Sequence, residues 1–447
     1  MCYKLGRMSE TAPPNEPAQA APVPPHPPRG ALAIVFFIVL MDLLGFGIII
    51  PLLAFYVPDF QNNHLKVTAL FSVYSICQFI GAPVLGVVSD RFGRKPVLAI
   101  SQAGSAAGYV LLALAAFHWR SRTTTLLLVY LSRIIDGFTG GNISTAQAYV
   151  SDVTTPENRA RGMGMLGAAF GVGFSFGPAL GGVLGHWDLS LPGWVAAGLS
   201  AAAAIFTWAR LPETRPHAET EAENWLHPSR FRPILRKPIL VQLLSISFCV
   251  MASFVMMEST ITLFLNKVFN WGELGVGLYF LFVGSIIIAV QGGLIGRLTK
   301  RLGDWPLCIA GPFLVAGGMG GLIAVAYAPP AAGFAAGLAL LLIAGAVNAT
   351  GRSFQQPTMS SLLSKFSDRN QQGVVFGLYH GLGSLARVVG PVVAGLAYSD
   401  RFLRNAGQFL VAGAIAIAMG LWTAALRQPA PRQAEPESAS EAALERG

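Results

Sequence analysis

Apolar positions along this chain fall into long runs that recur from residue 31 almost to the end of the sequence, with short polar segments between them. Each run is long enough to cross about 30 Å of hydrocarbon as an α-helix, which rises roughly 1.5 Å per residue. The pattern predicts an all-α membrane protein. Twelve membrane-spanning helices are expected, at residues 31–57, 66–88, 97–117, 125–150, 160–185, 192–211, 239–267, 273–296, 306–328, 333–363, 373–398 and 406–426.

The polar segments divide the chain into two bundles, a linker and two tails. Residues 1–30 are rich in Pro and Ala and lack the apolar run of a signal peptide, which predicts a disordered tail. The longest interior polar segment, 212–237, is interpreted as a linker between a six-helix bundle at 31–211 and a second one at 238–427. A charged tail at 428–447 closes the chain.

The composition supports a membrane protein and excludes several other classes. Of the 447 residues, 53% are hydrophobic and 12% are charged, whereas soluble domains carry roughly 25% charged residues. The net charge of +9 is spread in small groups between the apolar runs, which argues against a nucleic-acid partner. Four Cys and seven His show no metal-binding spacing, so neither a metal nor a cofactor is expected.

The distribution of Lys and Arg predicts the orientation of the chain. With both ends on the inner side, the inner segments hold 22 of the 31 Lys and Arg residues and the outer loops hold six. Because retained loops carry the excess of positive charge, both termini and the linker are expected in the cytoplasm of a cell with this protein in its inner (plasma) membrane. The other three cations, Arg133, Arg352 and Arg387, lie inside the apolar runs.

The second bundle repeats part of the first. Gly86, Arg91 and Gly93 recur as Gly296, Arg301 and Gly303 at an offset of 210, and Gly177 with Pro178 recurs as Gly390 with Pro391 at an offset of 213. Lys300 replaces Asp90 in this repeat. A parallel duplication of a six-helix unit, with pseudo-symmetric bundles, is the simplest interpretation.

Several motifs carry a resemblance to the major facilitator superfamily. The stretch 86–98 resembles its loop signature, with matches at Gly86, Asp90, Arg91, Gly93, Arg94 and Lys95. Residues 133–141 are similar to its helix-four signature, and Asp42 resembles the helix-one acidic motif of the drug:proton antiporters. Its helix-five antiporter signature is matched by Gly164, Gly173, Gly177, Pro178, Gly181 and Gly182.

Within that superfamily the chain looks most like the tetracycline-resistance-like multidrug exporters, through residues 43–53 and 141–154. Those exporters are expected to carry acids in helices three and nine and a His in helix eight. The runs 97–117 and 306–328 contain no acid, and 273–296 contains no His. The resemblance therefore does not assign tetracycline as the substrate.

The resemblance implies a major facilitator fold of twelve helices in two rocking bundles, and a role for each motif. The loop motif is expected to act as a cytoplasmic charge lock through Asp90, with Arg91, Arg94 and Lys95 facing the inner leaflet. The helix-five glycines allow close backbone approach where the bundles rock. This signature favours antiport over uptake.

Six ionisable residues lie within the apolar runs, namely Asp42, Arg133, Asp136, Glu258, Arg352 and Arg387. Each costs about 2.5–3.5 kcal/mol on insertion scales at mid-helix, so each requires a reason. Asp42 and Asp136 are expected at the same depth, and Asp42 is the hypothetical proton carrier with Arg133 as its modulator. An Arg133–Asp136 pair that only neutralises itself remains an open alternative.

The remaining intramembrane polar residues are candidates for substrate binding or for helix packing. Phe254, Glu258 and Thr262 are four residues apart on one helix face, which suits a lipophilic cation, although a plain interhelical hydrogen bond from Glu258 remains open. Gln147, Asn348 and Gln355 are further candidates, with helix packing as the alternative for the last two. Arg352 and Arg387 are interpreted as structural ion-pair partners.

Together these features predict a proton-coupled transporter that exports a small amphipathic compound by alternating access. Its partners are the substrate, protons and the lipid bilayer, and it is expected to act as a monomer. A facilitator or proton symporter that imports a nutrient, and a non-transporting membrane sensor, are the alternatives. An enzyme is not expected, because no constellation with catalytic spacing is present.

Overall fold

The computed structural model describes residues 30–117, 121–214, 232–327, 333–368, 371–398 and 405–426, without the side chains of 156–157 and 159–161. In this part the chain is almost entirely helical and contains no strand. The predicted tail at 428–447, all but the last residue of the predicted tail at 1–30, and most of the predicted linker, 215–231, lie outside the described residues.

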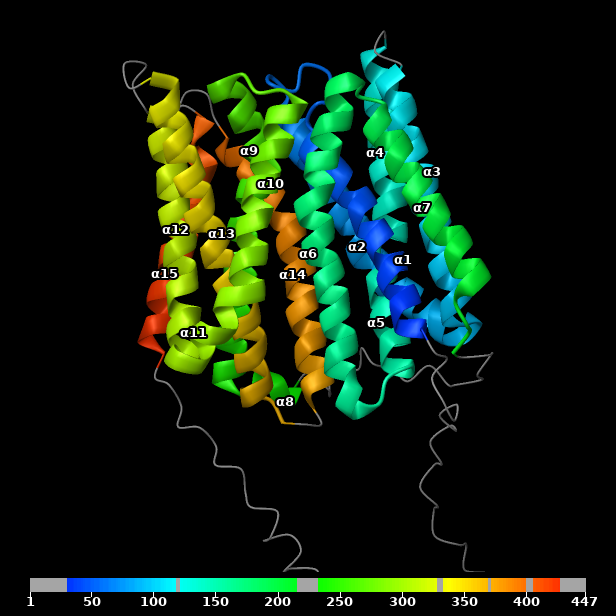
Figure 1. Ribbon diagram of the computed structural model, residues 1–447. Helices are drawn as coiled ribbons and strands as arrows, with labels where there is room; N and C mark the ends of the chain where they lie inside the picture. The colour runs from blue at the N-terminus through cyan, green and yellow to red at the C-terminus, as the bar shows by residue number, and fades with distance from the viewer. Residues whose placement is uncertain are drawn as a thin grey trace, which may run out of the picture.

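The helices form two groups that stand side by side in Figure 1. The first half contains α1 (Ala31–Ile49), η1 (Ile50–Leu52), α2 (His64–Phe92), α3 (Arg94–Phe117), α4 (Arg122–Thr139), α5 (Asn142–Asp152), α6 (Pro156–Trp187) and α7 (Leu191–Arg210). The second half contains α8 (Arg232–Leu235), α9 (Pro238–Phe269), α10 (Glu273–Ala289), the π-helical η3 (Val290–Leu294), α11 (Ile295–Leu302), α12 (Asp304–Tyr327), α13 (Gly333–Phe366), α14 (Gln372–Ala397) and α15 (Gly407–Ala425).

The helix ends define two faces of the molecule. The lower face of Figure 1 carries the start of α1, the short helices α5, α8 and α11, and the end of α15. The upper face carries η1 and the ends of α3, α6, α9 and α12. Both ends of the described chain are therefore on the lower face.

Eleven of the described segments are long and apolar enough to cross a membrane. The remaining predicted span, 125–150, which is the fourth along the chain, is not one continuous helix as expected. It is broken at Gly140 and Gly141 into α4 and α5. A Cβ on Gly141 would lie 2.6 Å from the backbone nitrogen of Ala82 on α2. The break therefore lets α2 approach the chain more closely than a side chain would allow. Together α4 and α5 still connect the two faces (Figure 1).

The hydrophobic core shows on which side the two halves meet. At the upper face one buried cluster combines residues of η1 and α2, such as Leu52 and Leu70, with Phe264 on α9 and Tyr279 on α10. At the lower face the clusters are separate, one confined to 31–211 and another built from 234–426. The halves are thus sealed together at the upper face and separated at the lower face.

Hydrogen bonds between the halves lie on the sealed side. Thr262 on α9 donates to the carbonyl of Pro51 at 3.0 Å, and the side-chain amide of Gln61 donates to Asn266 at 2.6 Å. Near mid-depth, Ser72 on α2 donates to the carbonyl of Val388 on α14 at 3.0 Å. The structure is a conformation closed at the upper face and open toward the lower face.

Candidate functional site

Two of the predicted intramembrane acids share one pocket near mid-depth. Asp42 on α1 and Asp136 on α4 both belong to its wall. The rest of its wall comes from Leu43, Phe46, Tyr74, Gln78, Ser105, Tyr109, Gly140, Ile143, Phe170, Phe174 and Arg387. All of these except Arg387 belong to the first half, so the pocket lies in that half and faces α14 of the other.

Asp136 and Arg133 form a sealed ion pair beside this pocket. Their closest atoms, Nη1 of Arg133 and Oδ2 of Asp136, are 3.2 Å apart, and both residues are 2% exposed. Ser105 and Tyr109 line the same pocket beside the Asp136 carboxylate. The Arg133 guanidinium lies 5.9 Å and 5.8 Å from the ring centroids of Tyr74 and Tyr109. The two charges neutralise each other out of contact with water.

Asp42 has a different environment from its neighbour Asp136. Its carboxylate accepts a hydrogen bond of 3.3 Å from the side-chain amide of Asn142 on α5, and the residue is only half-buried. An amide donates a hydrogen bond but supplies no charge. Arg133 already neutralises Asp136, whereas Asp42 has no ion-pair partner within 4 Å among the described residues, although Arg387 lines the same pocket.

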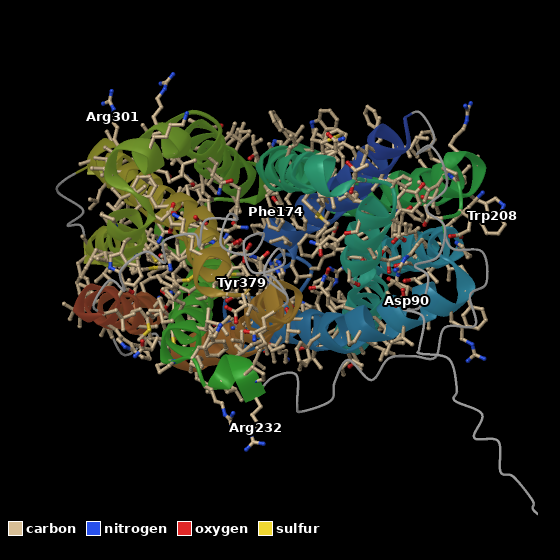
Figure 2. The ribbon with its side chains drawn as sticks, turned by 90° about the horizontal axis from the view of Figure 1, so that it is seen from below. Asp90, Phe174, Trp208, Arg232, Arg301 and Tyr379 are labelled. Atoms are coloured by element: carbon tan, nitrogen blue, oxygen red, sulfur yellow. The ribbon has the colours of Figure 1, made fainter. Side chains whose placement is uncertain are left out.

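An aromatic cluster that the sequence did not indicate forms one wall of the pocket. The rings of Phe46 and Tyr74 are 5.1 Å apart, those of Phe46 and Phe174 are 5.8 Å apart, and Phe170 stacks on Phe174 at 6.3 Å. Phe174 is visible near the boundary between the halves in Figure 2. These rings shield the acid pocket on the side of α6.

Phe174 also lines a second pocket, which belongs to the other half. This pocket is lined by Glu258 and Phe254 on α9, Asn348 on α13, and the apolar side chains of Met257, Ile261, Tyr279, Phe280, Val283 and Ile287. One residue of α6 thus separates the pocket of Asp42 from that of Glu258. The two halves each contribute one acid-containing pocket, and the pockets share a wall.

The intramembrane arginines of the second half surround Glu258 without pairing closely with it. The Arg352 guanidinium lies 4.9 Å from the centroid of the Phe254 ring and 3.0 Å from the sulfur of Met251. The charges of Arg387 and Arg352 both act on the Glu258 carboxylate. Within the described chain, however, neither arginine forms an ion pair within 4 Å, so the expected structural pairing has no close carboxylate here.

The other predicted substrate residues lie apart from these pockets. Thr262 is buried and occupied by its bond to Pro51 at the upper seal. Gln355 is buried between α13 and α12, where its side chain packs against Gly311. Gln147 is half-buried on α5 and lines neither pocket. Of the predicted set, the structure brings together Phe254, Glu258 and Asn348.

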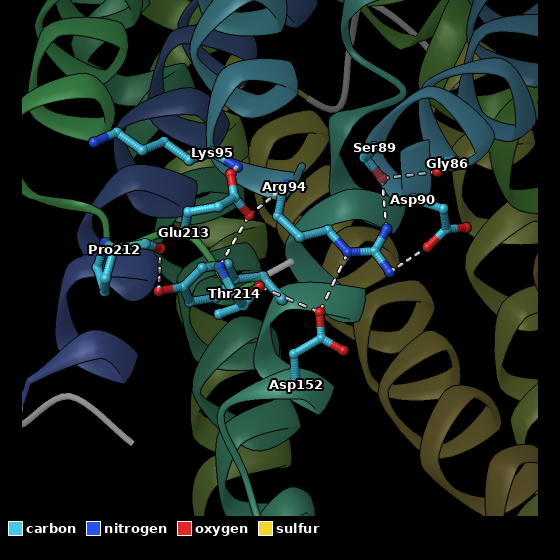
Figure 3. Close-up of polar contacts among 10 residues, drawn as sticks. Gly86, Ser89, Asp90, Arg94, Lys95, Asp152, Pro212, Glu213 and Thr214 are labelled. Atoms are coloured by element: carbon cyan, nitrogen blue, oxygen red, sulfur yellow. Dashed lines mark hydrogen bonds and ion pairs between the residues drawn. The ribbon is translucent and has the colours of Figure 1, made fainter. Parts of the chain in front are cut away.

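At the lower face the loop motif is organised around Arg94 (Figure 3). Its guanidinium forms ion pairs with Asp90 at 2.6 Å and with Asp152, at the end of α5, at 3.3 Å. It also donates to Ser89 at 2.5 Å. The prediction that Arg94 faces the inner leaflet is wrong, because these partners hold it at 5% exposure. All three partners belong to the first half.

Glu213, just after α7, completes this cluster by capping α3 (Figure 3). Its carboxylate accepts from the backbone N–H groups of Arg94 and Lys95 at 2.9 and 3.0 Å. A carboxylate is stabilised there by the unpaired N–H groups and the dipole of the helix. Gly93 has a φ of +100°, and a Cβ on it would lie 2.5 Å from Glu213. This position therefore requires glycine for two reasons.

The duplicated loop of the second half carries the same arrangement with opposite charges. Asp304, the residue after Gly303, is 6% exposed and pairs with Lys365 on α13 at 2.5 Å. It also accepts from Ser361 at 2.6 Å. Asp304 corresponds to Arg94 at the offset of 210, and Lys365 corresponds to Asp152 at the offset of 213. Each half thus anchors its lower end by one buried charge, of opposite sign.

The helix-five glycines place α6 between α1 and α10. A Cβ on Gly173 would lie 2.8 Å from Leu43, and one on Gly177 would lie 2.8 Å from Gly47. Gly181 packs on Ile48 of α1, and Gly182, adjacent to it, faces Gly277 on α10 across the boundary between the halves. Gly164, the first residue of the signature, has no neighbour within 4 Å of such a Cβ.

Comparison with known protein families shows to which family the chain belongs. The model of the Major Facilitator Superfamily matches residues 35–338 and 316–446. The chain belongs to this superfamily. Its relatives there include the class C tetracycline resistance protein of Escherichia coli, 30% identical over 83% of this chain and 90% of that protein. The class H protein of Pasteurella multocida is 28% identical over 89% of this chain and 96% of that protein.

A solved member of the superfamily has the same fold. The structure of the human organic anion transporter MFSD10 matches with a TM-score of 0.64 and 26% identity, and the match covers 89% of this chain and all of that one. The predicted fold class, a major facilitator fold built only of helices, is confirmed by this likeness and by the family model.

Proposed function

We propose that this chain is a proton-coupled transporter that exports a small amphipathic compound by alternating access. In this proposal the lower face is the cytoplasmic face, because the excess of Lys and Arg lies in the segments at that face. The observed opening toward the lower face is then the state that takes up substrate from the cell. The upper seal prevents leakage while the substrate binds.

The environment of Asp42 is the observation that carries the proposal. Asp42 is half-buried, lines the central pocket, and has the Asn142 amide as its hydrogen-bond partner. No described cation forms an ion pair with this carboxylate within 4 Å, so a proton is the simplest counter-charge available to it. The sealed Arg133–Asp136 pair supplies a fixed set of charges at its side. Asp42 can therefore exchange a proton with whichever face the cavity opens to.

The alternation of the two halves would connect this proton exchange to substrate movement. Phe174 lines the pockets of both Asp42 and Glu258, so a substrate in the second pocket lies one side chain from the proton site. A ligand in one pocket changes the space available in the other pocket and the electrostatic potential there. This proximity supports coupling by mutual exclusion, in which protonation of Asp42 favours release of the substrate.

The relatives support export. The tetracycline resistance proteins are named for protection against a drug, and the antiporter signature of α6 is present here in full. The substrate of those proteins is not transferred to this chain, because the third and ninth helices here lack the acids that the resemblance predicts.

The direction of flow is the test of this proposal. Inside-out vesicles that contain the protein should accumulate a toxic amphipathic compound when their lumen is made acidic, and should lose protons from the lumen as they do so. A broad toxicity screen in a bacterium without its own pumps would first identify the compound. Movement of the compound and protons in the same direction would instead show a symporter, and the absence of any movement would show a sensor.

A further inference from the structure

The charges around the central cavity are divided unequally between the two halves. In the first half, Asp42 and Asp136 face one cation, Arg133, which leaves an excess of one negative charge. In the second half, Glu258 faces two cations, Arg352 and Arg387, which leaves an excess of one positive charge. The proton proposed for Asp42 removes the first excess. Among the described residues of the second half, no acid lies within 4 Å of Arg352 or Arg387 to remove the other.

Arg352 is held in place by groups that do not neutralise it. The ring of Phe254 and the sulfur of Met251 are its contacts, and it is only half-buried. A ring face attracts a cation and a thioether is a weak acceptor, but neither carries a charge. Because its fork of N–H donors suits planar or tetrahedral anions, Arg352 is prepared for an acidic group.

These contacts also exclude the cation site that the sequence suggested. The Phe254 ring was expected to offer its face to a cationic substrate, and the guanidinium of Arg352 already lies on that ring. A cation beside Glu258 would also meet two positive charges for one negative charge. Electrostatic repulsion in a site of low dielectric constant would disfavour it.

We propose that the second pocket takes an amphipathic anion whose apolar body lies against Phe174, Tyr279 and Phe280. Its acidic group would reach Arg352, which lies on the Phe254 ring of that pocket, and Arg387, which lines the adjoining pocket of Asp42. This assignment deepens the proposed transport function and rests on it. The rings supply the apolar surface typical of small-molecule pockets. Arg387 lines the pocket of Asp42 as well, so the bound anion would lie next to the proton site.

The test compares three probes of one shape and different charge, namely naphthalene-2-sulfonate, naphthalene-2-sulfonamide and naphthalen-2-ylmethylammonium. Binding to the purified full-length protein in lipid nanodiscs would be measured by titration calorimetry. The sulfonate is expected to bind at least tenfold more tightly than the neutral or the cationic probe. Absence of this preference, including absence of binding by all three probes, would overturn the assignment.

Variants identify the residues responsible. Arg352→Gln and Arg387→Gln should each weaken sulfonate binding at least tenfold, whereas Arg297→Gln, an exposed arginine on α11, should leave it unchanged. Glu258→Gln should strengthen it, since a competing negative charge is removed. Arg352→Lys keeps the charge and loses the planar fork of N–H donors, so its affinity for the sulfonate is expected to be intermediate. This variant allows the role of Arg352 to be tested if the glutamine variant does not fold.

The opposite pattern would contradict the assignment directly. A cation site requires that the ammonium probe binds best, that Glu258→Gln abolishes its binding and that Arg352→Gln strengthens it. If such a cation were exchanged for protons in a manner that requires Asp42, the anion assignment would fail while the proposed function stood. Sulfonate binding with the expected arginine dependence but without proton-coupled movement would instead refute the proposed function alone.

Discussion

Arg133 and Asp136 illustrate how strongly a buried charge depends on its partner. At 2% exposure each, the two residues have exchanged their hydration for one another, for Ser105 and for two tyrosine rings. Such a pair is a weak source of stability as a whole, but either member alone is costly in this environment. This asymmetry separates the role of the pair from that of Asp42.

We therefore expect Arg133→Met to destabilise the protein by about 3–5 kcal/mol, because it leaves the Asp136 carboxylate buried without a cation. The double substitution Arg133→Met with Asp136→Leu should recover most of this loss. Unfolding of the purified protein in detergent, followed by circular dichroism, measures both. A loss in the double variant equal to the sum of the two single losses would show that the two side chains act independently.

The two loop glycines give a second comparison at the residue scale. Gly93 and Gly303 have φ values of +100° and +82°, so alanine at either position should cost about 1–3 kcal/mol in backbone strain. A Cβ at Gly93 would also displace Glu213, whereas one at Gly303 meets nothing within 4 Å. Gly93→Ala should thus lower the melting temperature more than Gly303→Ala. Equal shifts would mean that the Glu213 cap contributes nothing.

The sequence predicts the charged part of the site and misses its aromatic part, for a physical reason. A charge in hydrocarbon is costly, so Asp42 and Glu258 stand out wherever they occur. Phe174 and Tyr74 cost nothing in an apolar run and give no signal until the helices are placed. Helical spacing alone also assigns too many residues to one binding face. Thr262 follows Glu258 by one turn, but it belongs to the upper seal rather than to the pocket.

At the scale of the elements, α6 and α10 pack against each other across the boundary between the halves. They run antiparallel, and close contacts join Gly182 to Gly277 and Gly284 to Ser175. If the two helices keep this register toward the lower face, Gly164 on α6 lies opposite Gly296 on α11, to within one residue. A Cβ on either of these glycines would have no neighbour within 4 Å in the observed state.

This register predicts a function for Gly164 that packing in the open state does not explain. Closure of the lower face should bring Gly164 against Gly296, so Gly164→Leu should block closure and reduce transport at least tenfold while substrate binding is retained. Gly198→Leu is the matched control, because Gly198 is exposed on α7 with nothing near its Cβ position. Transport by the Gly164→Leu variant at the normal rate would disprove the register.

Two elements also mark the limit of prediction from the apolar pattern. The run 125–150 is continuous in the sequence, yet it is divided at Gly140 and Gly141 by the close approach of α2. The eighth run contains a π-helical segment, η3, between α10 and α11. The first deviation depends on the backbone of a neighbouring helix, which hydrophobic periodicity within one helix does not contain.

At the scale of the whole molecule, the duplication predicted two halves, and the charge pattern at their lower ends is reversed between them. The sequence could not indicate which face is open, because an alternating transporter must stabilise both states to within a few kcal/mol. The observed state depends on the upper seal. Its hydrogen bonds from Thr262 to Pro51 and from Gln61 to Asn266 join the halves at one face only.

Weakening the seal should shift the equilibrium between the two states. Thr262→Val removes the hydrogen bond to Pro51 and keeps the shape of the side chain, so about 0.5–1.5 kcal/mol of the upper closure should be lost. Spin labels at Asn158 and Lys300, both exposed at the lower ends of α6 and α11, should then report a larger population of short distances. Thr260→Val is the control, because Thr260 donates to Met256 within its own helix.

The central claim is that Asp42 carries the proton that is exchanged for the substrate. Substrate-driven proton flux in proteoliposomes with an imposed pH gradient tests it most directly, with the compound identified by the toxicity screen. Asp42→Asn should abolish the flux and retain substrate binding, whereas Asp59→Asn, an acid in the loop at the upper face with a φ of +50° that Asn tolerates, should leave the flux intact. Undiminished proton flux through the Asp42→Asn protein would contradict the account.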